Sequence, residues 1–394
     1  MAPTETLDYR VSTVDHDIIC APDTITGMAA SLESLGVSRV LVVCGPTILK
    51  HSNVVQRVQE ALGDLCIGLF SGVVPHSPVE MLEEAAAIAR ELQPDVLVAV
   101  GGGSTSDTCK GIAVLLAEGG EVADYEIRFE PPNKVFVPET PHKKIPIIAV
   151  ATTLGAAELS RGGGGFTSKK LGRKILISGK GTTPRVIIID GQALATTPLS
   201  IQLSTGIGQF RIAVESLYSK DHQPIGDALA LHTIKMLVEH LPQCVDQNID
   251  SLLQAKSASC MIMLARPGLG LNTAMAHNIG GLYDVPHGEA NSIILPYTMR
   301  FNLDASADRQ VLIAQAMGID TSNMTNEDAG LAASDGVSQL CQKLGLPMRL
   351  RDVGVPEEGL ELIAAATLHD RGLATNPKQI TDAGPIMSVL QDAW

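Results

Sequence analysis

The sequence predicts an α/β domain built on a parallel sheet, followed by an all-α domain. Up to residue 190, short continuous apolar runs alternate with segments of helical periodicity, which is typical of a sheet covered by helices on both faces. From Pro198 onward the β-branched runs give way to patterns with a period of about 3.6 residues. The length of 394 residues also exceeds one ordinary hydrophobic core. We therefore expect two domains, 1–192 and 193–394.

The predicted strands share a composition rich in Val, Ile and Leu and are bounded by Gly, Pro or polar residues. They are 39–44, 66–70, 96–100, 145–150 and 186–190. Helices are expected before and between them, at 28–35, 54–62, 79–92 and 111–116. Because these strands carry apolar side chains on both faces, the sheet is expected to be buried and parallel.

Helical periodicity fills the second half of the chain. The predicted helices are 204–219, 225–241, 249–264, 272–280, 289–302, 308–316, 330–344 and 357–367. Aromatic residues make up only 3% of the chain, so the cores must be built from Ala, Val, Leu and Ile. Side chains of this size suit close packing of helices on a sheet.

Composition and charge exclude several classes of function. A formal net charge of −14 would repel a phosphate backbone or an anionic lipid surface, so neither nucleic acid nor a membrane is an expected partner. No signal peptide is visible, and no apolar run approaches the ~20 residues needed to cross a bilayer. The seven cysteines are scattered and form no CxxC pair, which favours reduced thiols in a cytoplasmic protein over a disulfide framework or a structural zinc site.

A glycine-rich junction is the strongest chemical signal in the first domain. Gly101-Gly102-Gly103-Ser104 directly follows the predicted strand 96–100 and leads into a helix. Glycines let the backbone approach a ligand closely, and the N–H groups at a helix start attract anions, so a phosphate or pyrophosphate is the natural occupant. The alternative is a tight turn with ordinary capping, because this run is not a GxGxxG fingerprint.

Two histidines ten residues apart mark the second domain. His277 ends a small-residue helical run, and His287 stands between Pro286 and Gly288 in a turn that leads into an apolar helix. Three interpretations are open for these imidazoles: ligands of a metal, carriers of a proton, or satisfied polar residues in a core.

The ordered motifs of the chain resemble those of the iron-containing (group III) alcohol dehydrogenase family over nearly its whole length. The glycine junction, extended to Asp107 and Lys110, is similar to the nucleotide-binding signature of that family. The segment from Met275 to Asn302 is similar to its second signature. Further similar motifs are Thr152-Thr153, 186–190, Thr205-Gly206, Glu215, Asn376-Pro377 and Ala393-Trp394. Some details, His76 among them, are similar to the maleylacetate reductase branch.

The resemblance implies a dehydroquinate synthase-like fold, in which a Rossmann-like domain that binds NAD or NADP precedes the helical domain, with the active site in the cleft between them. By motif match, the residues lining the cofactor would be Gly102, Gly103, Ser104, Asp107, Thr152, Thr153 and Lys174. Gly45 and His76 take two further cofactor positions, where many members have Asp and Asn. Without a carboxylate at position 45 there is no repulsion against a 2′-phosphate, so both NAD and NADP remain candidates for the cofactor. The alternative for His76 is a surface turn residue.

The resemblance also indicates which positions would hold a metal ion. Members that bind iron or zinc use one Asp and three His, and these positions correspond here to Gly208, Ile212, Thr273 and His287. One imidazole and one hydroxyl cannot hold a catalytic divalent ion, which needs about three protein ligands. We therefore expect no metal.

Catalysis without a metal requires other groups to stabilise the developing alkoxide. Arg211, beside the former ligand positions, would bind a substrate carboxylate or an oxyanion; the alternative is a salt bridge with Glu215 at i+4. His277 and His287 would donate the proton that completes carbonyl reduction. The alternatives are a core histidine bonded to backbone for His277 and a turn-stabilising residue for His287.

Two unusual runs lie in the last part of the first predicted domain. Arg161-Gly-Gly-Gly-Gly-Phe166 would form either a mobile loop over the cleft or, as we favour, a flexible surface connection. The basic run 169–174 is explained mostly as solvated charge. Lys174 is the exception, because it matches the lysine that faces the cofactor in the family.

The leading hypothesis is a metal-independent, NAD(P)H-dependent reductase of an activated ketone, aldehyde or enone. Its substrate would be a small molecule, carboxylated in one version of the hypothesis, and the protein would be a homodimer. One alternative is a metal-dependent alcohol dehydrogenase with a relocated site. Another is a family member that keeps the nucleotide but has been repurposed for binding or non-redox chemistry.

Overall fold

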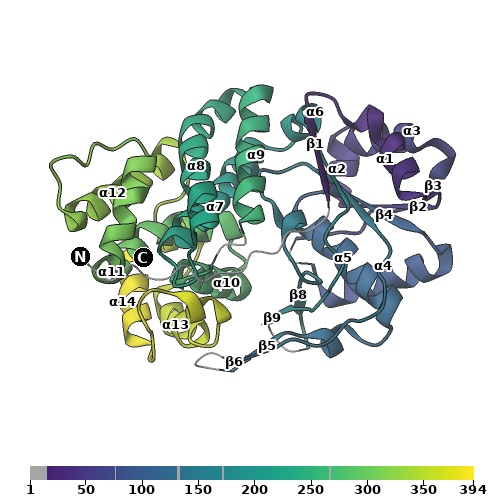
Figure 1. Ribbon diagram of the computed structural model, residues 1–394. Helices are drawn as coiled ribbons and strands as arrows, with labels where there is room; N and C mark the ends of the chain where they lie inside the picture. The colour runs from purple at the N-terminus through teal and green to yellow at the C-terminus, as the bar shows by residue number, and fades with distance from the viewer. Residues whose placement is uncertain (1–15, 76, 131–133, 171–172, 266–267) are drawn as a thin grey trace.

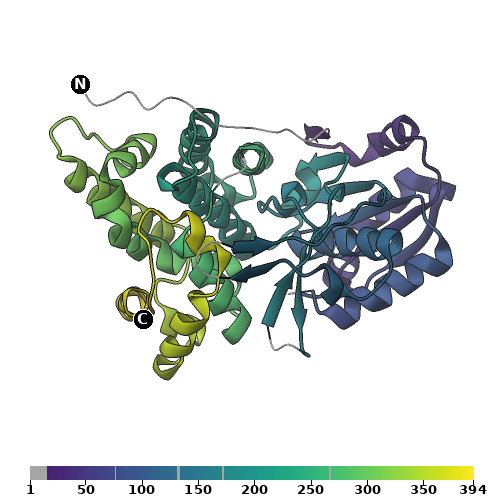
Figure 2. The same ribbon diagram turned by 60° about the horizontal axis from the view of Figure 1, so that its bottom comes forward.

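The computed structural model describes residues 16–75, 77–130, 134–170, 173–265 and 268–394. Its first half is a six-stranded sheet with the order β1-β10-β7-β4-β2-β3, in which every pairing is parallel. The strands are β1 (Asp17–Ala21), β2 (Val40–Cys44), β3 (Cys66–Phe70), β4 (Val96–Gly101), β7 (Ile147–Ala151) and β10 (Val186–Asp190). All five predicted strands are therefore confirmed; β1, at the sheet edge, was not predicted. Figures 1 and 2 show this half beside the helical half.

Helices cover both faces of the sheet. On one face lie α1 (Met28–Leu35) and α3 (Val54–Leu62), and on the other α4 (Val79–Leu92) and α5 (Gly103–Glu118). Alternate residues of β2 face the two helical layers. Val40 and Val42 pack with α1 and α3, whereas Leu41 and Val43 pack with α4 and α5. Burial on both faces explains why the strands read as continuous apolar runs.

Two short hairpins extend from the sheet half and were not predicted. They pair β5 (Arg128–Glu130) with β6 (Lys134–Phe136) and β8 (Gly165–Ser168) with β9 (Arg173–Leu176). The expectation of a surface connection at the four glycines is wrong, because Gly163 and Gly165 are buried. A side chain at Gly163 would meet the Ser178 carbonyl oxygen at 2.6 Å, so the run permits a close crossing of two backbones.

The regular elements described in the second half are all helices, joined by turns and irregular segments. They are α6 (Gly191–Ala195), α7 (Leu199–Tyr218), α8 (Pro224–His240), α9 (Ile249–Leu264), α10 (Leu271–Tyr283), α11 (His287–Ala316), α12 (Asn326–Lys343), α13 (Leu360–Thr367) and α14 (Gly384–Ala393). The predicted helices 289–302 and 308–316 correspond to the two parts of α11, which meet in a kink at Ser306, where φ (−151°) and ψ (21°) are not helical. None of the described helices has the length and apolarity needed to span a membrane. The last strand ends at Asp190, and the boundary at 192/193 stays a prediction.

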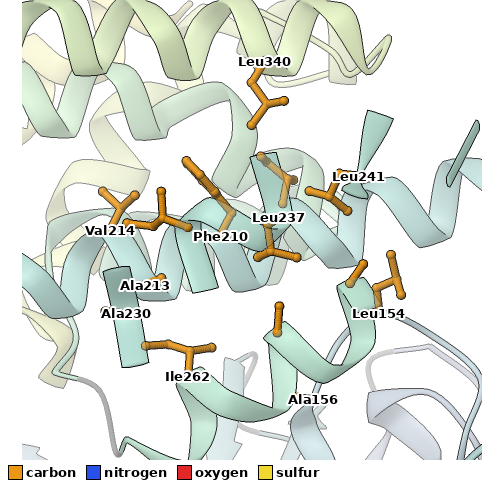
Figure 3. Packing of buried hydrophobic residues seen from close by; sticks show 14 of the residues in the cluster. Leu154, Ala156, Phe210, Ala213, Val214, Ala230, Leu237, Leu241, Ile262 and Leu340 are labelled. Atoms are coloured by element: carbon orange, nitrogen blue, oxygen red, sulfur yellow. The ribbon is translucent and has the colours of Figure 1, made fainter. Parts of the chain in front are cut away.

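One hydrophobic core joins the two halves. Sheet residues such as Ile187 and Ile189 belong to the same buried cluster as Phe210 of α7 and Leu237 of α8. Figure 3 shows Leu154, from the loop after β7, packed among the helices of the second half. The helical half is therefore anchored on the sheet rather than tethered to it by a linker.

Asp190, at the end of β10, is a buried hub of hydrogen bonds. Its carboxylate accepts bonds from the backbone N–H groups of Thr24 (2.8 Å), Ile25 (3.1 Å) and Ala193 (2.8 Å). Both Nη atoms of Arg57 also donate to it, at 3.1 and 2.9 Å. Burial alone would raise the pKa of Asp190, but the Arg57 guanidinium and the three N–H donors outweigh it and hold the pKa below its usual value. The hub ties the sheet to α3, to α6 and to the segment before α1.

We expect Asp190→Asn to lower the free energy of unfolding by about 3 kcal/mol at pH 7, because it leaves the Arg57 charge without its buried partner. A carboxylate with a lowered pKa contributes its full stability above the unfolded-state pKa of about 3.9 and loses it as the pH falls. The difference between wild type and variant should therefore shrink in acid. Urea unfolding from pH 7 down to about pH 2 measures both effects, because the loss falls below the unfolded-state pKa.

Asp23→Asn is the matched control, because Asp23 contacts the same guanidinium at 3.0 Å but its side chain is 43% exposed. An exposed partner of this kind contributes less than about 1 kcal/mol. Equal losses from the two substitutions would contradict the role assigned to Asp190.

Candidate functional site

Three neighbouring strands end at the same edge of the sheet and bring together most of the predicted cofactor residues. Cys44 of β2 pairs with Val100 of β4, and Gly101 of β4 pairs with Ala151 of β7. The residues that follow these ends are Gly45, Gly102, Gly103, Ser104, Thr152 and Thr153. They lie side by side because the strands are parallel, so their carboxyl ends face the same way.

The start of α5 forms a cradle for an anion. Its first i to i−4 bond runs from the Ser106 N–H to the Gly102 oxygen at 3.2 Å, so the amides of residues 103–105 have no partner within the helix. Among the described residues, no side chain caps this end. A side chain at Gly102 would meet Thr153 Cγ2 at 2.9 Å, which explains the glycine. The cradle fits the pyrophosphate of a dinucleotide.

Three other predicted cofactor residues lie away from this cradle or outside the described chain. Asp107 is one turn further along α5, and its Oδ2 accepts a hydrogen bond from the Gly165 N–H at 3.0 Å. Lys174 is on β9, where its Cε would lie 2.7 Å from a side chain placed at Gly165. His76 lies outside the described residues. The cofactor roles of all three stay predictions.

A buried lysine of α5 fixes the loop that follows β7. Lys110 is fully buried, and its Nζ donates to the carbonyl oxygens of Ala157 (2.6 Å) and Ser160 (2.9 Å) and to the Ser160 hydroxyl (2.8 Å). Burial lowers the pKa of Lys110, while the nearby carboxylates of Asp107 and Glu158 act in the opposite direction. The lysine of the glycine motif thus binds protein backbone rather than a ligand.

A second buried lysine reaches the same loop from the helical half. Lys256 of α9 donates to Glu158 Oε1 at 2.6 Å and to the carbonyl oxygen of Gly155. Its side chain is 0% exposed and that of Glu158 is 6% exposed, so this ion pair is removed from solvent. Sequence reasoning missed both residues, because the pair joins segments 98 residues apart and neither lies in a recognisable motif.

Arg211 belongs to a buried network on α7 and α10. Its Nη1 contacts Glu215 Oε2 at 3.1 Å and donates to the Thr273 hydroxyl. That hydroxyl donates to Glu215 Oε2 at 2.5 Å, and the Thr273 N–H donates to Glu215 Oε1 at 3.2 Å. The i+4 salt bridge considered for Arg211 is therefore present. Its Nε has no hydrogen-bond partner among the described residues.

His277 and His287 face each other as a stacked pair, with ring centroids 5.5 Å apart and an angle of 15° between the planes. His277 Nδ1 lies 2.8 Å from Asp370 Oδ2, and Asp370 Oδ1 accepts a bond from the Gly372 N–H at 2.7 Å. A carboxylate that accepts from Nδ1 fixes the ring and leaves Nε2 for another partner. Sequence reasoning missed Asp370, which comes from a distant loop.

His287 is reached by solvent, yet protein atoms crowd its ring. This crowding, followed by the positive charges of His277, Arg211 and Lys174, holds the pKa of His287 well below its usual value. A bond with the Ala276 backbone acts in the opposite direction. Two predicted catalytic residues, Arg211 and His277, and the predicted cofactor residue Lys174 therefore lie close enough to His287 to lower its pKa.

The residues at the family's metal-ligand positions do not fit a divalent ion. Gly208 and Ile212 offer no donor, and the Thr273 hydroxyl is bound to Arg211 and Glu215. A guanidinium beside these positions would repel a cation. Within the described ranges, no three His, Cys, Asp or Glu side chains are grouped to hold a metal. Metal independence itself stays a prediction, because the donor set addresses only this location.

Comparison with known proteins gives matches over nearly the whole chain. The family described as "Iron-containing alcohol dehydrogenase" matches residues 15–191, and "Fe-containing alcohol dehydrogenase family, C-terminal" matches residues 202–394. Lactaldehyde reductase of Escherichia coli (strain K12) is 30% identical over 365 residues, covering 91% of this chain and 93% of its own. Maleylacetate reductase of Pseudomonas knackmussii is 26% identical over 399 residues, covering 98% and 97%.

A solved structure supports the same relationship. The crystal structure of a 1,3-propanediol oxidoreductase is 28% identical, with a TM-score of 0.88, and the match covers 98% of this chain and 100% of that one. Its likeness confirms the predicted dehydroquinate synthase-like fold, with a parallel-sheet domain followed by a helical domain.

We expect Lys256→Met to lower the free energy of unfolding by about 3–5 kcal/mol, because Glu158 would remain as an uncompensated buried charge. The double variant Lys256→Met, Glu158→Gln removes both charges and should regain part of that loss. Urea unfolding of the wild type, both single variants and the double variant completes the thermodynamic cycle. Strictly additive effects would mean that the two side chains are not coupled.

Proposed function

We propose that this chain, which belongs to the iron-containing alcohol dehydrogenase family, reduces an activated ketone, aldehyde or enone without a catalytic metal. Family membership makes it an NAD(P)-dependent oxidoreductase. The choice of substrate class and the absence of a metal are our inference. A homodimer is proposed with it from the family resemblance, and a cytoplasmic location from the scattered cysteines.

The observation that carries the proposal is the network at the ligand positions. Arg211 Nη1, Glu215 and the Thr273 hydroxyl are bonded to one another, and the positive charge beside His287 is a guanidinium held by the protein. Two of the former ligand positions, Gly208 and Ile212, carry no donor, and Thr273 is bonded to the neighbouring Arg211 and Glu215, as is expected of a site that is stable without an ion. A site that had merely lost its ion would leave unpaired carboxylates or imidazoles.

The residues at the sheet edge would hold the cofactor, with its pyrophosphate at the amides of residues 103–105. NAD(P)H bound there supplies the hydride for carbonyl reduction. His277 would deliver the proton to the substrate oxygen from Nε2, because Asp370 already occupies Nδ1. His287, held neutral by its surroundings, would serve as a hydrogen-bonding partner rather than as an acid.

A site without a catalytic ion requires a substrate whose carbonyl group is already activated. A divalent ion stabilises the developing alkoxide by several kcal/mol, whereas neutral hydrogen-bond donors and a paired guanidinium contribute less. An electron-withdrawing neighbour of the carbonyl makes up the difference, because it lowers the energy of the alkoxide. A relative named maleylacetate reductase supports a substrate of this kind, including a carboxylated one.

We expect purified protein to contain iron and zinc far below one equivalent and to keep its NAD(P)H-dependent reductase activity in the presence of EDTA. Elemental analysis by mass spectrometry measures the metals, and nicotinamide absorbance measures the activity with a panel of dicarbonyls, enones and oxo acids. Added Fe²⁺ or Zn²⁺ should produce no gain. One equivalent of metal, together with inactivation by the chelator, would favour a relocated metal site. Cofactor binding without reduction of any compound would favour a repurposed member.

We expect His277→Asn to reduce kcat by ~100-fold or more, because proton delivery contributes 10²–10⁴-fold in typical enzymes. Asp370→Asn should cause a smaller loss, since it frees the ring without removing it. Fluorescence titration with NADH and NADPH should give unchanged dissociation constants for both variants. A parallel loss of cofactor binding would instead indicate a structural role for His277.

A further inference from the structure

Gly208 differs from the other buried glycines of the described chain. It lies inside α7 and is buried, yet apart from its chain neighbours and the backbone of its own helix no described atom comes within 4 Å of the Cβ that a side chain would place there. Gly206, two residues earlier, has the opposite surroundings, because its Cβ would overlap the Leu241 side chain. Protein interiors are close-packed, so an unfilled space beside a buried backbone is unusual.

Contacts on either side of Gly208 locate this space. One turn earlier on α7, the Ser204 carbonyl packs against Gly288, in the first turn of α11. One turn later, Arg211 contacts Thr273 in the first turn of α10. Residues 204, 208 and 211 share one face of the helix. The space therefore opens between the starts of α10 and α11.

The catalytic candidates border the same region. His287 begins α11, and His277 lies one turn after Thr273 on the same face of α10. Their rings stack across the gap between the two helices. A carbonyl group in contact with these rings would point one of its substituents toward α7.

The walls of the space define what it accepts. Gly208 contributes no side chain, and the neighbouring Ile212 is apolar. Arg211 offers one N–H donor, Nε, that has no partner among the described residues, while its Nη1 is already bound to Glu215 and Thr273. A buried donor of this kind favours an oxygen acceptor on the ligand.

We propose that Gly208 determines substrate specificity: the space beside it receives the substituent of the reacting carbonyl, and this substituent carries an oxygen acceptor. The enzyme would then prefer ketones with an adjacent carbonyl or carboxylate over unsubstituted aldehydes. The inference rests on the proposed reductase function, which it narrows to a substrate class.

The test uses Gly208→Ala and Gly208→Val, because an added Cβ meets no neighbouring element within 4 Å and both residues have a higher helix propensity than glycine. Each protein is assayed for NAD(P)H-dependent reduction of glyoxal, methylglyoxal, 2,3-butanedione and 2,3-pentanedione, which share an activated carbonyl and differ in the substituent. We expect kcat/KM for the diketones to fall by about 10-fold or more with Ala and further with Val, since one methylene changes discrimination by about 10–200-fold. Glyoxal should be affected least.

Gly27→Ala is the matched control, because Gly27 is exposed, has equally open surroundings and lies in the first half of the chain, before α1. The ratio of diketone to glyoxal activity should not change in this variant. An unchanged ratio in both Gly208 variants, or an equal change in Gly27→Ala, would overturn the inference.

A binding measurement separates this inference from the proposed function. Thermal shifts produced by the same four compounds are recorded with NADH or NADPH present. If no compound is reduced but the shift from 2,3-butanedione still declines from wild type to Ala to Val, Gly208 borders the binding space and only the reductase proposal fails. If 2,3-butanedione is neither bound nor reduced by the wild type, the inference is wrong.

Discussion

Two buried ammonium groups hold the loop between β7 and β8, and most of the candidate site depends on that loop. Lys110 binds it from the sheet half and Lys256 from the helical half. The loop carries Thr153, which packs against Gly102, and Ala157, which packs against Gly103. Removing two charges from water is costly unless each finds close partners, and here backbone carbonyls and Glu158 supply them. The cradle at α5 thus keeps its shape through contacts with both halves of the molecule.

The sequence predicted the elements whose patterns are local. The strands 66–70 and 186–190 and the helices 54–62 and 79–92 have the predicted bounds. The start of α5 was placed eight residues too late, because a run of Gly, Ser and Thr has low helix propensity and is helical here only through its tertiary setting. The edge strand β1 and the β8–β9 hairpin are short and pair with distant or glycine-rich segments, so periodicity gave no sign of them.

In the candidate site, too, residues in local motifs could be predicted, whereas their partners from distant parts of the sequence could not. Motifs placed Arg211, His277 and His287 in one region, and the structure brings them together with Lys174. Their hydrogen-bond partners come from distant parts of the sequence: Asp370 lies 93 residues from His277, and Thr273 lies 62 residues from Arg211. A single sequence does not reveal such pairings. The cofactor residues at the sheet edge were easier to place, since each follows directly after a recognisable strand.

The core shared by the sheet and α7–α9 limits the motion of the two halves relative to each other. Domains joined by a small polar interface swing about a hinge, but separating these halves would expose Ile187, Phe210 and their neighbours to water. Large rigid-body swings are therefore strongly disfavoured. Ligands must enter and leave through local rearrangements of loops and side chains, which occur faster than domain rotation. Turnover in this protein would then be paced by chemistry or by small gating motions rather than by opening of the whole molecule.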